Sequence, residues 1–243
     1  NNTNVKEGWT VDLVDYRDMK TYTIYKAADG NCWMGQNLAL TGPMTLSSED
    51  TDLAKTTSWF LPASVSDWTN DNTIVEIKTG NTSIKDWKNG YGNYYSWCAA
   101  TADTCQINGV PIAQDVDASS SICPKGWKLP AYSGDYSFQN LVSTKSSWLT
   151  DQTINNVTGV KGYRLGSTKT MIYQDANFWA AAGEFSTDLL YGSTSDGNYW
   201  SRRAKSTLYA YYLNFYSGAV RPQYDGNRID RFRGYSVRCV VQY

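Results

Sequence analysis

The chain has 243 residues, a net charge of −1, five cysteines and no histidine. This length suffices for one domain that buries a full core without a metal. The lack of histidine excludes a Ser-His-Asp hydrolase, and the lack of a Cys-x-x-Cys pair argues against a structural zinc site. No apolar run is long enough to predict a membrane span.

Aromatic residues make up 14% of the chain, and glycine is frequent. Few stretches have a helical period, so the composition favours a strand- and loop-rich fold over a helical bundle. No segment resembles a linker. We therefore predict a single domain over residues 1–243, with residues 1–20 as an N-terminal extension.

The first predicted elements follow "TYTIYKAADGNCWMGQNLAL". Residues 22–26 alternate with the period of a strand, and "ADGN" is a turn signal, so the pattern predicts strand, turn and strand up to Leu40. The Ser/Asp-rich start of "SSEDTDLAKTTSW" favours a short helix. Residues 61–92 are polar and rich in turns, which predicts irregular structure with short strands.

A second helix is predicted after "CPKGWKLP". Its apolar face would comprise Phe138, Leu141, Val142 and Leu149, and Asp135 or Ser137 would cap its N-terminus. More turns and aromatic anchors follow over residues 150–198.

Residues 199–240 form the stretch with the most regular pattern. Alternation puts Tyr209, Tyr211, Leu213 and Phe215 on an inward face, and Ala210, Tyr212, Asn214 and Tyr216 on an outward face. Ser217-Gly218 predicts a hairpin turn, and Val220 would point inward from the return strand. "PQYDGNRIDRFRG" has the composition of a loop. In the final strand, "YSVRCVVQY", Val237, Cys239 and Val241 would share one face.

Charge is unevenly distributed, because seven of the nine arginines lie between Arg202 and Arg238. A basic segment can indicate nucleic-acid binding, but here arginine is mixed with Asp, Asn and Tyr, unlike a phosphate-binding stripe. We therefore expect no nucleic-acid partner. Tyr and Arg carry much of the binding energy at protein interfaces, so an exposed binding surface is the favoured interpretation. The alternative is that these side chains merely cover a sheet.

Four motifs in order, "DGNCWMGQNLAL", "YGNYYSWCAA", "CPKGWKLP" and "GYSVRCV", resemble the Fibrobacter succinogenes major paralogous domain. The resemblance runs from about Tyr22 to the end of the chain. It implies an α+β, C-type-lectin-like fold, with short antiparallel sheets, one or two helices and long irregular loops. It also implies a bacterial protein that is secreted or displayed at the cell surface, as an adhesin would be.

The stretch "YWS…AYYLNF…SGAV…RCV" is similar to the variable region of proteins targeted by diversity-generating retroelements. In such systems adenine-directed mutagenesis converts asparagine codons into codons for Tyr, Asp, Ser, Arg and others. The resemblance implies that residues 198–240 form a variable ligand-binding region on a constant scaffold.

Carried over by residue, the scaffold positions are Trp200, Leu213, Phe215, Val237 and Cys239. The variable, ligand-binding positions are Arg203, Tyr209, Tyr212, Asn214, Tyr216, Arg221, Tyr224, Asp225, Asn227, Asp230, Arg231 and Tyr235. Among them we expect Tyr212, Tyr216 and Tyr224 as anchors, the arginines as charged donors, and Asp225 and Asp230 as acceptors.

Cysteine usage and the resemblance together predict two disulfides. Lectin-like folds tie the early helix region to the closing strand, which implies a Cys123–Cys239 bond. Cys98 and Cys105 are close enough to close a small loop, so they form the second predicted pair. Cys32 is then expected to be a buried thiol. Disulfides imply that the protein is located in an oxidising compartment. The polar start "NNTNVKEG" is expected to be a mature end from which a signal segment was removed.

The predicted function is non-covalent binding of a protein or other cell-surface ligand, without enzymatic activity, cofactor or metal. A carbohydrate-binding module that uses the same aromatic residues is the main alternative, and an enzyme of the cell surface is a third. The calcium-dependent sugar motif of true C-type lectins is not evident, since "QYD" stands at 223–225.

Overall fold

The computed structural model describes most of the chain outside residues 41–91. The described residues are 6–40, 44–46, 57–59, 74–75, 92–102, 106–107, 110–111, 115–144, 146–154, 157–166, 176–186, 189–192, 195–224, 231 and 233–241.

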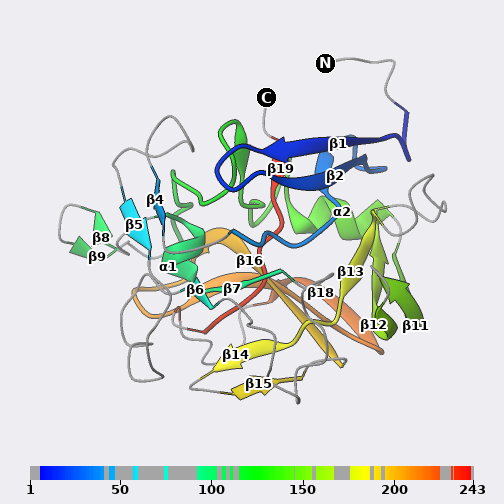
Figure 1. Cartoon of the computed structure of the whole chain (residues 1–243). Coiled ribbons are helices and arrows are strands. Elements are labelled where there is room, and N and C mark those ends of the chain that lie inside the picture. Colours follow the sequence, from blue (N-terminus) through cyan, green and yellow to red (C-terminus); the bar gives the residue numbers. More distant parts are fainter. Residues whose placement is uncertain are drawn as a thin grey trace.

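Within these residues the fold consists of short antiparallel sheets and two short helices (Figure 1). This confirms the coarse part of the predicted fold class. In the first half of the chain the elements are β1 Thr10–Asp15, β2 Lys20–Lys26, β3 Cys32–Met34, β4 Met44–Leu46, β5 Thr57–Trp59, β6 Ile74–Val75, β7 Tyr94–Tyr95, α1 Trp97–Ala100, β8 Gln106–Ile107 and β9 Val110–Pro111. In the second half they are β10 Trp127–Lys128, α2 Phe138–Thr144, β11 Ser146–Ile154, β12 Val157–Leu165, β13 Phe178–Ala180, β14 Glu184–Ser186, β15 Leu189–Tyr191, β16 Asp196–Ala204, β17 Ala210–Tyr216, β18 Ala219–Tyr224 and β19 Val240–Val241.

The first sheet joins the two ends of the described chain in the order β1-β2-β3-β19-β10. Strands β2 and β3 are the strands predicted around the "ADGN" turn, and Gly30 occupies that turn with φ 84°. Strand β1 lies within the predicted N-terminal extension, yet it pairs with β2 along its whole length. The N-terminal segment from Thr10 is therefore part of the sheet.

Helix α2 begins where the sequence predicts but ends earlier, at Thr144. Ser137 provides the cap, because its Oγ accepts a hydrogen bond from the backbone N–H of Asn140 at 3.2 Å. Leu149, predicted on the helix, lies instead in β11. There Trp148 stands opposite Tyr163 of β12, with their ring centroids 5.2 Å apart, so cross-strand packing overrides the helical pattern.

The short helix predicted within residues 47–59 falls almost entirely outside the described residues, apart from strand β5 at its end.

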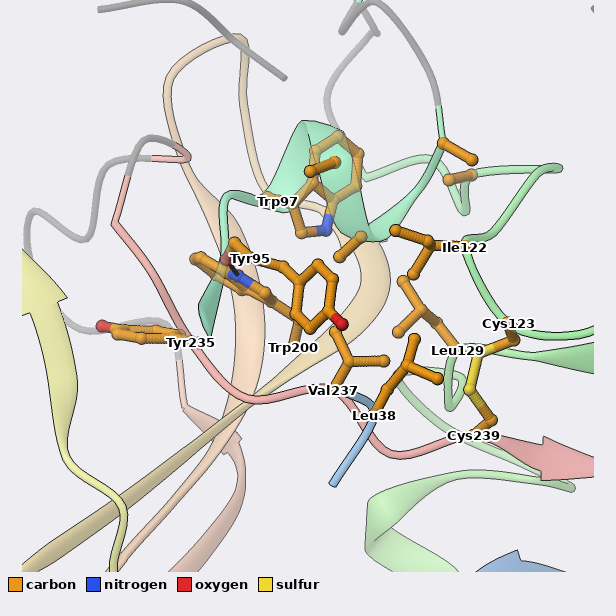
Figure 2. Packing of buried hydrophobic residues seen from close by; sticks show 14 of the residues in the cluster. Leu38, Tyr95, Trp97, Ile122, Cys123, Leu129, Trp200, Tyr235, Val237 and Cys239 are labelled. Carbon is orange, nitrogen blue, oxygen red and sulfur yellow. Dashed lines mark hydrogen bonds between the residues drawn. A yellow bond between two sulfur atoms is a disulfide. The ribbon is translucent and has the colours of Figure 1, made fainter. Parts of the chain in front are cut away.

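The sheet β16-β17-β18, which we call the tail sheet, is buried on both faces over much of its area. Tyr199, Leu213 and Phe215 point into one core, which also contains Trp33, Phe138 and Trp179. The neighbouring residues Trp200, Ala210 and Tyr212 point into the other core. Figure 2 shows part of this other core, with Trp97, Tyr95, Trp200 and Tyr235 near one end and Cys123 and Cys239 near the other.

Residues 233–241, which we call the closing segment, follow the tail sheet and hold it in place. Tyr235 exchanges two backbone hydrogen bonds with Tyr95, at 2.9 and 3.0 Å, and Ser236 forms a parallel bridge with Tyr199. Val237 and Cys239 are both fully buried in the same core, as the parity predicts. Regular strand structure is limited to Val240–Val241, which is shorter than the predicted strand.

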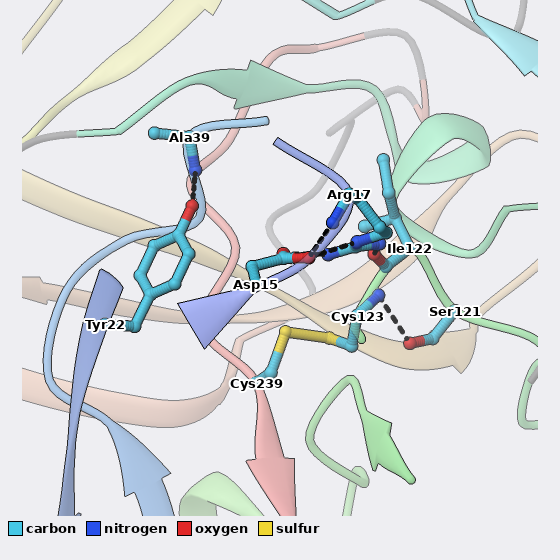
Figure 3. Close-up of a disulfide and its surroundings, with 8 residues drawn as sticks. All are labelled: Asp15, Arg17, Tyr22, Ala39, Ser121, Ile122, Cys123 and Cys239. Carbon is cyan, nitrogen blue, oxygen red and sulfur yellow. Dashed lines mark hydrogen bonds and ion pairs between the residues drawn. A yellow bond between two sulfur atoms is a disulfide. The ribbon is translucent and has the colours of Figure 1, made fainter. Parts of the chain in front are cut away.

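The predicted bond between Cys123 and Cys239 is present and spans 116 positions of the chain (Figure 3). A buried ion pair lies beside it: Arg17 donates from Nε to Oδ1 of Asp15 at 2.8 Å. Nη1 of the same guanidinium donates to the carbonyl of Ile122, the residue before Cys123. The β1–β2 turn is thus attached to the disulfide that closes the domain.

The other cysteines are only partly covered by the structure. Cys98 forms a disulfide, and its predicted partner Cys105 lies outside the described residues. Cys32 is present as a thiol on β3, and it is half-buried against the core of Figure 2 where full burial was expected.

Replacing both Cys123 and Cys239 by alanine should lower the free energy of unfolding by about 4–5 kcal/mol, because the unfolded chain regains the entropy of a loop longer than 100 residues. Urea denaturation of the oxidised proteins measures this. Cys32→Ala serves as the control and should change the same quantity by less than about 1 kcal/mol. Equal stability of the double variant and the wild type would contradict this prediction.

Alkaline pH should destabilise the fold through its buried phenols. Burial raises the pKa of Tyr22, Tyr25, Tyr95, Tyr199, Tyr212 and Tyr235 above the ordinary tyrosine value. Because the folded state holds protons that the unfolded state releases, stability is complete below about pH 10 and falls as the pH rises above it. Absorbance at 295 nm should rise in two steps, first for accessible phenols and then cooperatively as near-UV circular dichroism disappears. A single gradual step with retained dichroism would contradict this.

Candidate ligand-binding surface

The outward positions of the tail sheet separate into an accessible group and a buried group. The accessible group, which we call the Arg221 cluster, comprises the exposed Arg221 and the half-buried Asn214, Tyr216 and Tyr224. In the register of β17 and β18, Asn214 stands opposite Arg221, while Tyr224 stands opposite Tyr212 and Tyr216 opposite Ala219. Arg221 therefore lies between the two tyrosines along the strand and on the same face of the sheet.

The side chains of the Arg221 cluster hold one another in place. The guanidinium carbon of Arg221 lies 5.1 Å from the ring centroid of Tyr216 and 4.8 Å from that of Tyr224. Nη2 of Arg221 also donates a hydrogen bond to Oη of Tyr216 at 3.1 Å. Asn214 is fixed from the other side, because its Nδ2 donates to Oδ1 of Asn198 at 3.0 Å. The cluster thus presents an exposed arginine with restricted motion.

Tyr212, Tyr235 and Glu184 form a layer, which we call the supporting layer, on which this cluster packs. The ring of Tyr212 packs 5.4 Å from that of Tyr224 and 4.8 Å from that of Tyr235, measured between centroids. Oη of Tyr235 donates to Oε2 of Glu184 at 3.1 Å, and the same carboxylate forms an ion pair with Arg233. The layer joins β14, the tail sheet and the closing segment.

Tyr212 and Tyr235 were predicted to contact ligand, and the structure corrects this. Tyr212 is 2% exposed and Tyr235 is fully buried. Alternation assigns Tyr212 to the correct face of β17, but that face is covered at this point by Trp200 and the closing segment. Alternation along a strand shows which face a residue occupies and not whether another segment covers that face.

Arg231 was also expected on the surface, and it is 2% exposed. Its guanidinium lies 4.5 Å from the ring centroid of Trp97, and its Nε donates to the carbonyl of Tyr209 at 3.3 Å. A second donor reaches the carbonyl of Ser206. Arg231 therefore fastens the loop between β16 and β17 to helix α1, so it supports the fold rather than the surface.

A second accessible group lies on the opposite face of the sheet. Tyr211, predicted to be in the core, is half-buried, with its ring centroid 4.4 Å from that of Tyr132. The guanidinium of Arg203 lies 5.6 Å from the ring centroid of Tyr132, and Arg203 also pairs with Asp117 at 3.3 Å. Tyr211 is only half-buried because the core on its face of β17 includes Leu213 and Phe215 but does not extend to Tyr211.

The remaining predicted positions do not join the Arg221 cluster in the described structure. Tyr209 is half-buried, and its backbone bonds to Lys205 and Arg231. Asp225, Asn227 and Asp230 lie outside the described residues.

The tail pattern did not reveal Tyr132, Glu184 or Gln223, which also shape this region. Gln223 donates from Nε2 to the carbonyl of Tyr132 at 2.9 Å and so ties β18 to the segment before α2. Tyr132 and Glu184 come from outside the tail, and a pattern within one segment cannot show contacts from another. An aromatic residue in the turn-rich "PAYSGDYS" is the one signal that the sequence offers for Tyr132.

Within the described part of the chain, no group of Cys, Asp and Glu side chains is arranged to hold a metal ion. None of the helices described here is long and apolar enough to cross a membrane. Comparison of the chain with protein-family models, curated proteins and solved structures finds no match.

Tyr212→Ala should lower the free energy of unfolding by about 3–5 kcal/mol, because it opens a cavity in the core. Tyr216→Ala should lower it by less, about 1 kcal/mol, since that side chain is only half-buried and belongs to neither core. Chemical denaturation of both variants measures the difference. Similar losses of stability for the two variants would contradict the division into a supporting layer and the Arg221 cluster.

Proposed function

We propose that this chain is a ligand-binding protein with a C-type-lectin-like fold, and that the Arg221 cluster is the centre of its binding surface. The work of the protein is recognition, without catalysis. The partner is a macromolecule, either a protein or another ligand at a cell surface.

The observation that carries this proposal is the stack of Tyr216, Arg221 and Tyr224 on an accessible sheet face. Large side chains that are already held in their bound geometry lose little entropy when a partner binds. Tyr and Arg are also the residues most enriched among the energetic centres of interfaces. A surface that merely covers a sheet has no need of an exposed arginine fixed between two rings.

The buried scaffold of the tail fits a site whose exposed side chains are exchanged during diversification. The five scaffold positions inferred from the family resemblance, Trp200, Leu213, Phe215, Val237 and Cys239, are all fully buried. Because substitutions at Asn214, Tyr216 or Arg221 leave these contacts intact, ligand specificity can change while the fold is retained. We propose on this basis that the tail is the target of a diversity-generating retroelement, and that the protein is secreted or displayed at a bacterial surface.

Binding can be tested with a displayed random peptide library and a glycan array, the latter with and without calcium. Ligands obtained from either should lose about tenfold or more in affinity for the variant Tyr216→Ser/Arg221→Ser. The matched control is Tyr16→Ser/Met19→Ser, which removes two side chains that are 83% and 67% exposed in the β1–β2 turn. It should bind as the wild type does.

Ligands that bind the Tyr216→Ser/Arg221→Ser variant as well as the wild type would place recognition elsewhere and overturn the proposed site. Diversification has a separate test in the DNA downstream of the gene. A near-copy of the bases that encode residues 198–240, differing chiefly at adenines and lying beside a reverse transcriptase gene, is the expected result. A locus without such a copy would contradict diversification but not binding.

A further inference from the structure

Among the residues that the structure describes, every tail arginine except one is either paired with a carboxylate or buried. Arg202 and Arg203 share the carboxylate of Asp117, at 3.1 and 3.3 Å. Arg233 pairs with Glu184. Two further arginines, Arg231 and Arg238, are buried.

Arg221 is the exception. It is exposed, and no carboxylate in the described part of the chain forms an ion pair with it. Its only side-chain hydrogen bond to the described residues is the one from Nη2 to Tyr216. That bond uses one of five N–H donors, so one two-donor edge of the guanidinium stays open toward solvent.

We propose that the Arg221 cluster binds the carboxylate of an Asp or Glu side chain on an acidic protein segment. This inference rests on the proposed function and names the chemistry of its ligand. A carboxylate accepts two parallel hydrogen bonds from the edge of a guanidinium, and such charge-assisted bonds are stronger than those between neutral groups. The rings of Tyr216 and Tyr224 hold that edge in place and contact the hydrocarbon part of the incoming side chain.

The number of available charges favours a carboxylate over a phosphate or a sulfated glycan. A phosphate carries nearly two negative charges, and polyanions are bound by several cations at once. Here one exposed arginine has an open edge, while Arg202 and Arg203 share the one carboxylate of Asp117 and Arg233 is paired with Glu184. A single positive charge matches the single negative charge of one carboxylate.

The edge of β18 also favours recognition of a partner by side chains over addition of a partner strand to the sheet. β18 is an edge strand of the tail sheet, and Pro222 within it has no N–H to donate. Addition of a partner strand to this edge would leave one position of the hydrogen-bond ladder unpaired. The side chains of the cluster are therefore the groups that select the partner.

The experiment is selection of peptides from a displayed random library against the wild-type protein, followed by affinity measurement for individual peptides. Selected peptides should share an Asp or Glu at a recurrent position. Arg221→Gln should weaken them by about tenfold or more, and Arg221→Lys, which keeps the charge but not the fork, by less. Lys125→Gln, which removes an exposed charge in the turn before β10, is the matched control and should have no effect.

A double-mutant cycle gives the decisive readout. Changing the recurrent Glu of a peptide to Gln should cost as much as Arg221→Gln, and the two changes together should cost little more than either. If peptides lose affinity for Tyr216→Ser/Arg221→Ser but show no acidic preference, the carboxylate inference fails and the proposed function stands. If a sulfated glycan is preferred over every peptide, this inference also fails. If the peptides ignore the whole cluster, both proposals fail.

Discussion

Burial of the tail sheet on both faces is the constraint on which the rest of the structure depends. Along β17, Leu213 and Phe215 fill one core while Ala210 and Tyr212 fill the other. A strand in this position cannot slip by one residue, because a slip would exchange the contents of two closely packed cores. On the last two strands of the sheet, side chains reach solvent at Tyr211, Asn214 and Tyr216 of β17 and along the edge strand β18.

A buried arginine, Arg238, also stabilises this scaffold. Arg238 is 2% exposed and lies 4.4 Å from the ring centroid of Trp179. Its Nε donates to Asn37 and its Nη2 to the carbonyl of Phe178, both at 2.7 Å, and burial lowers its pKa. Aromatic faces and carbonyl groups take the place of a carboxylate here. The closing segment is thereby fastened to β13 through Phe178 and to the segment after β3 through Asn37.

The sequence allowed prediction of the parts of this fold that are determined locally. The hairpin turn at Ser217-Gly218, the cap at Ser137 and the inward direction of Leu213 and Phe215 all follow from patterns within a few residues. The disulfide from Cys123 to Cys239 came from the family resemblance, since spacing alone allows other pairings.

Other features depend on segments that are distant in sequence, and these were not predictable from a local pattern. Tyr212 and Tyr235 are buried because they pack against each other and against Trp200. Tyr211 is half-buried because the core on its face of β17 does not extend beyond Leu213. β18 continues through Pro222 to Tyr224, where composition indicated a loop, because an edge strand tolerates a missing N–H. The predicted site residues therefore include an accessible group and a buried group that supports it.

The position of the Cys123–Cys239 bond has a consequence for how much change the tail sheet tolerates. The two sulfurs lie 116 positions apart, and the loop that they close contains the entire tail sheet. The bond limits the entropy that the chain gains on unfolding, and it does so whichever side chains the exposed positions of the sheet carry. Substitutions at those positions can therefore cost some packing energy before the fold is lost.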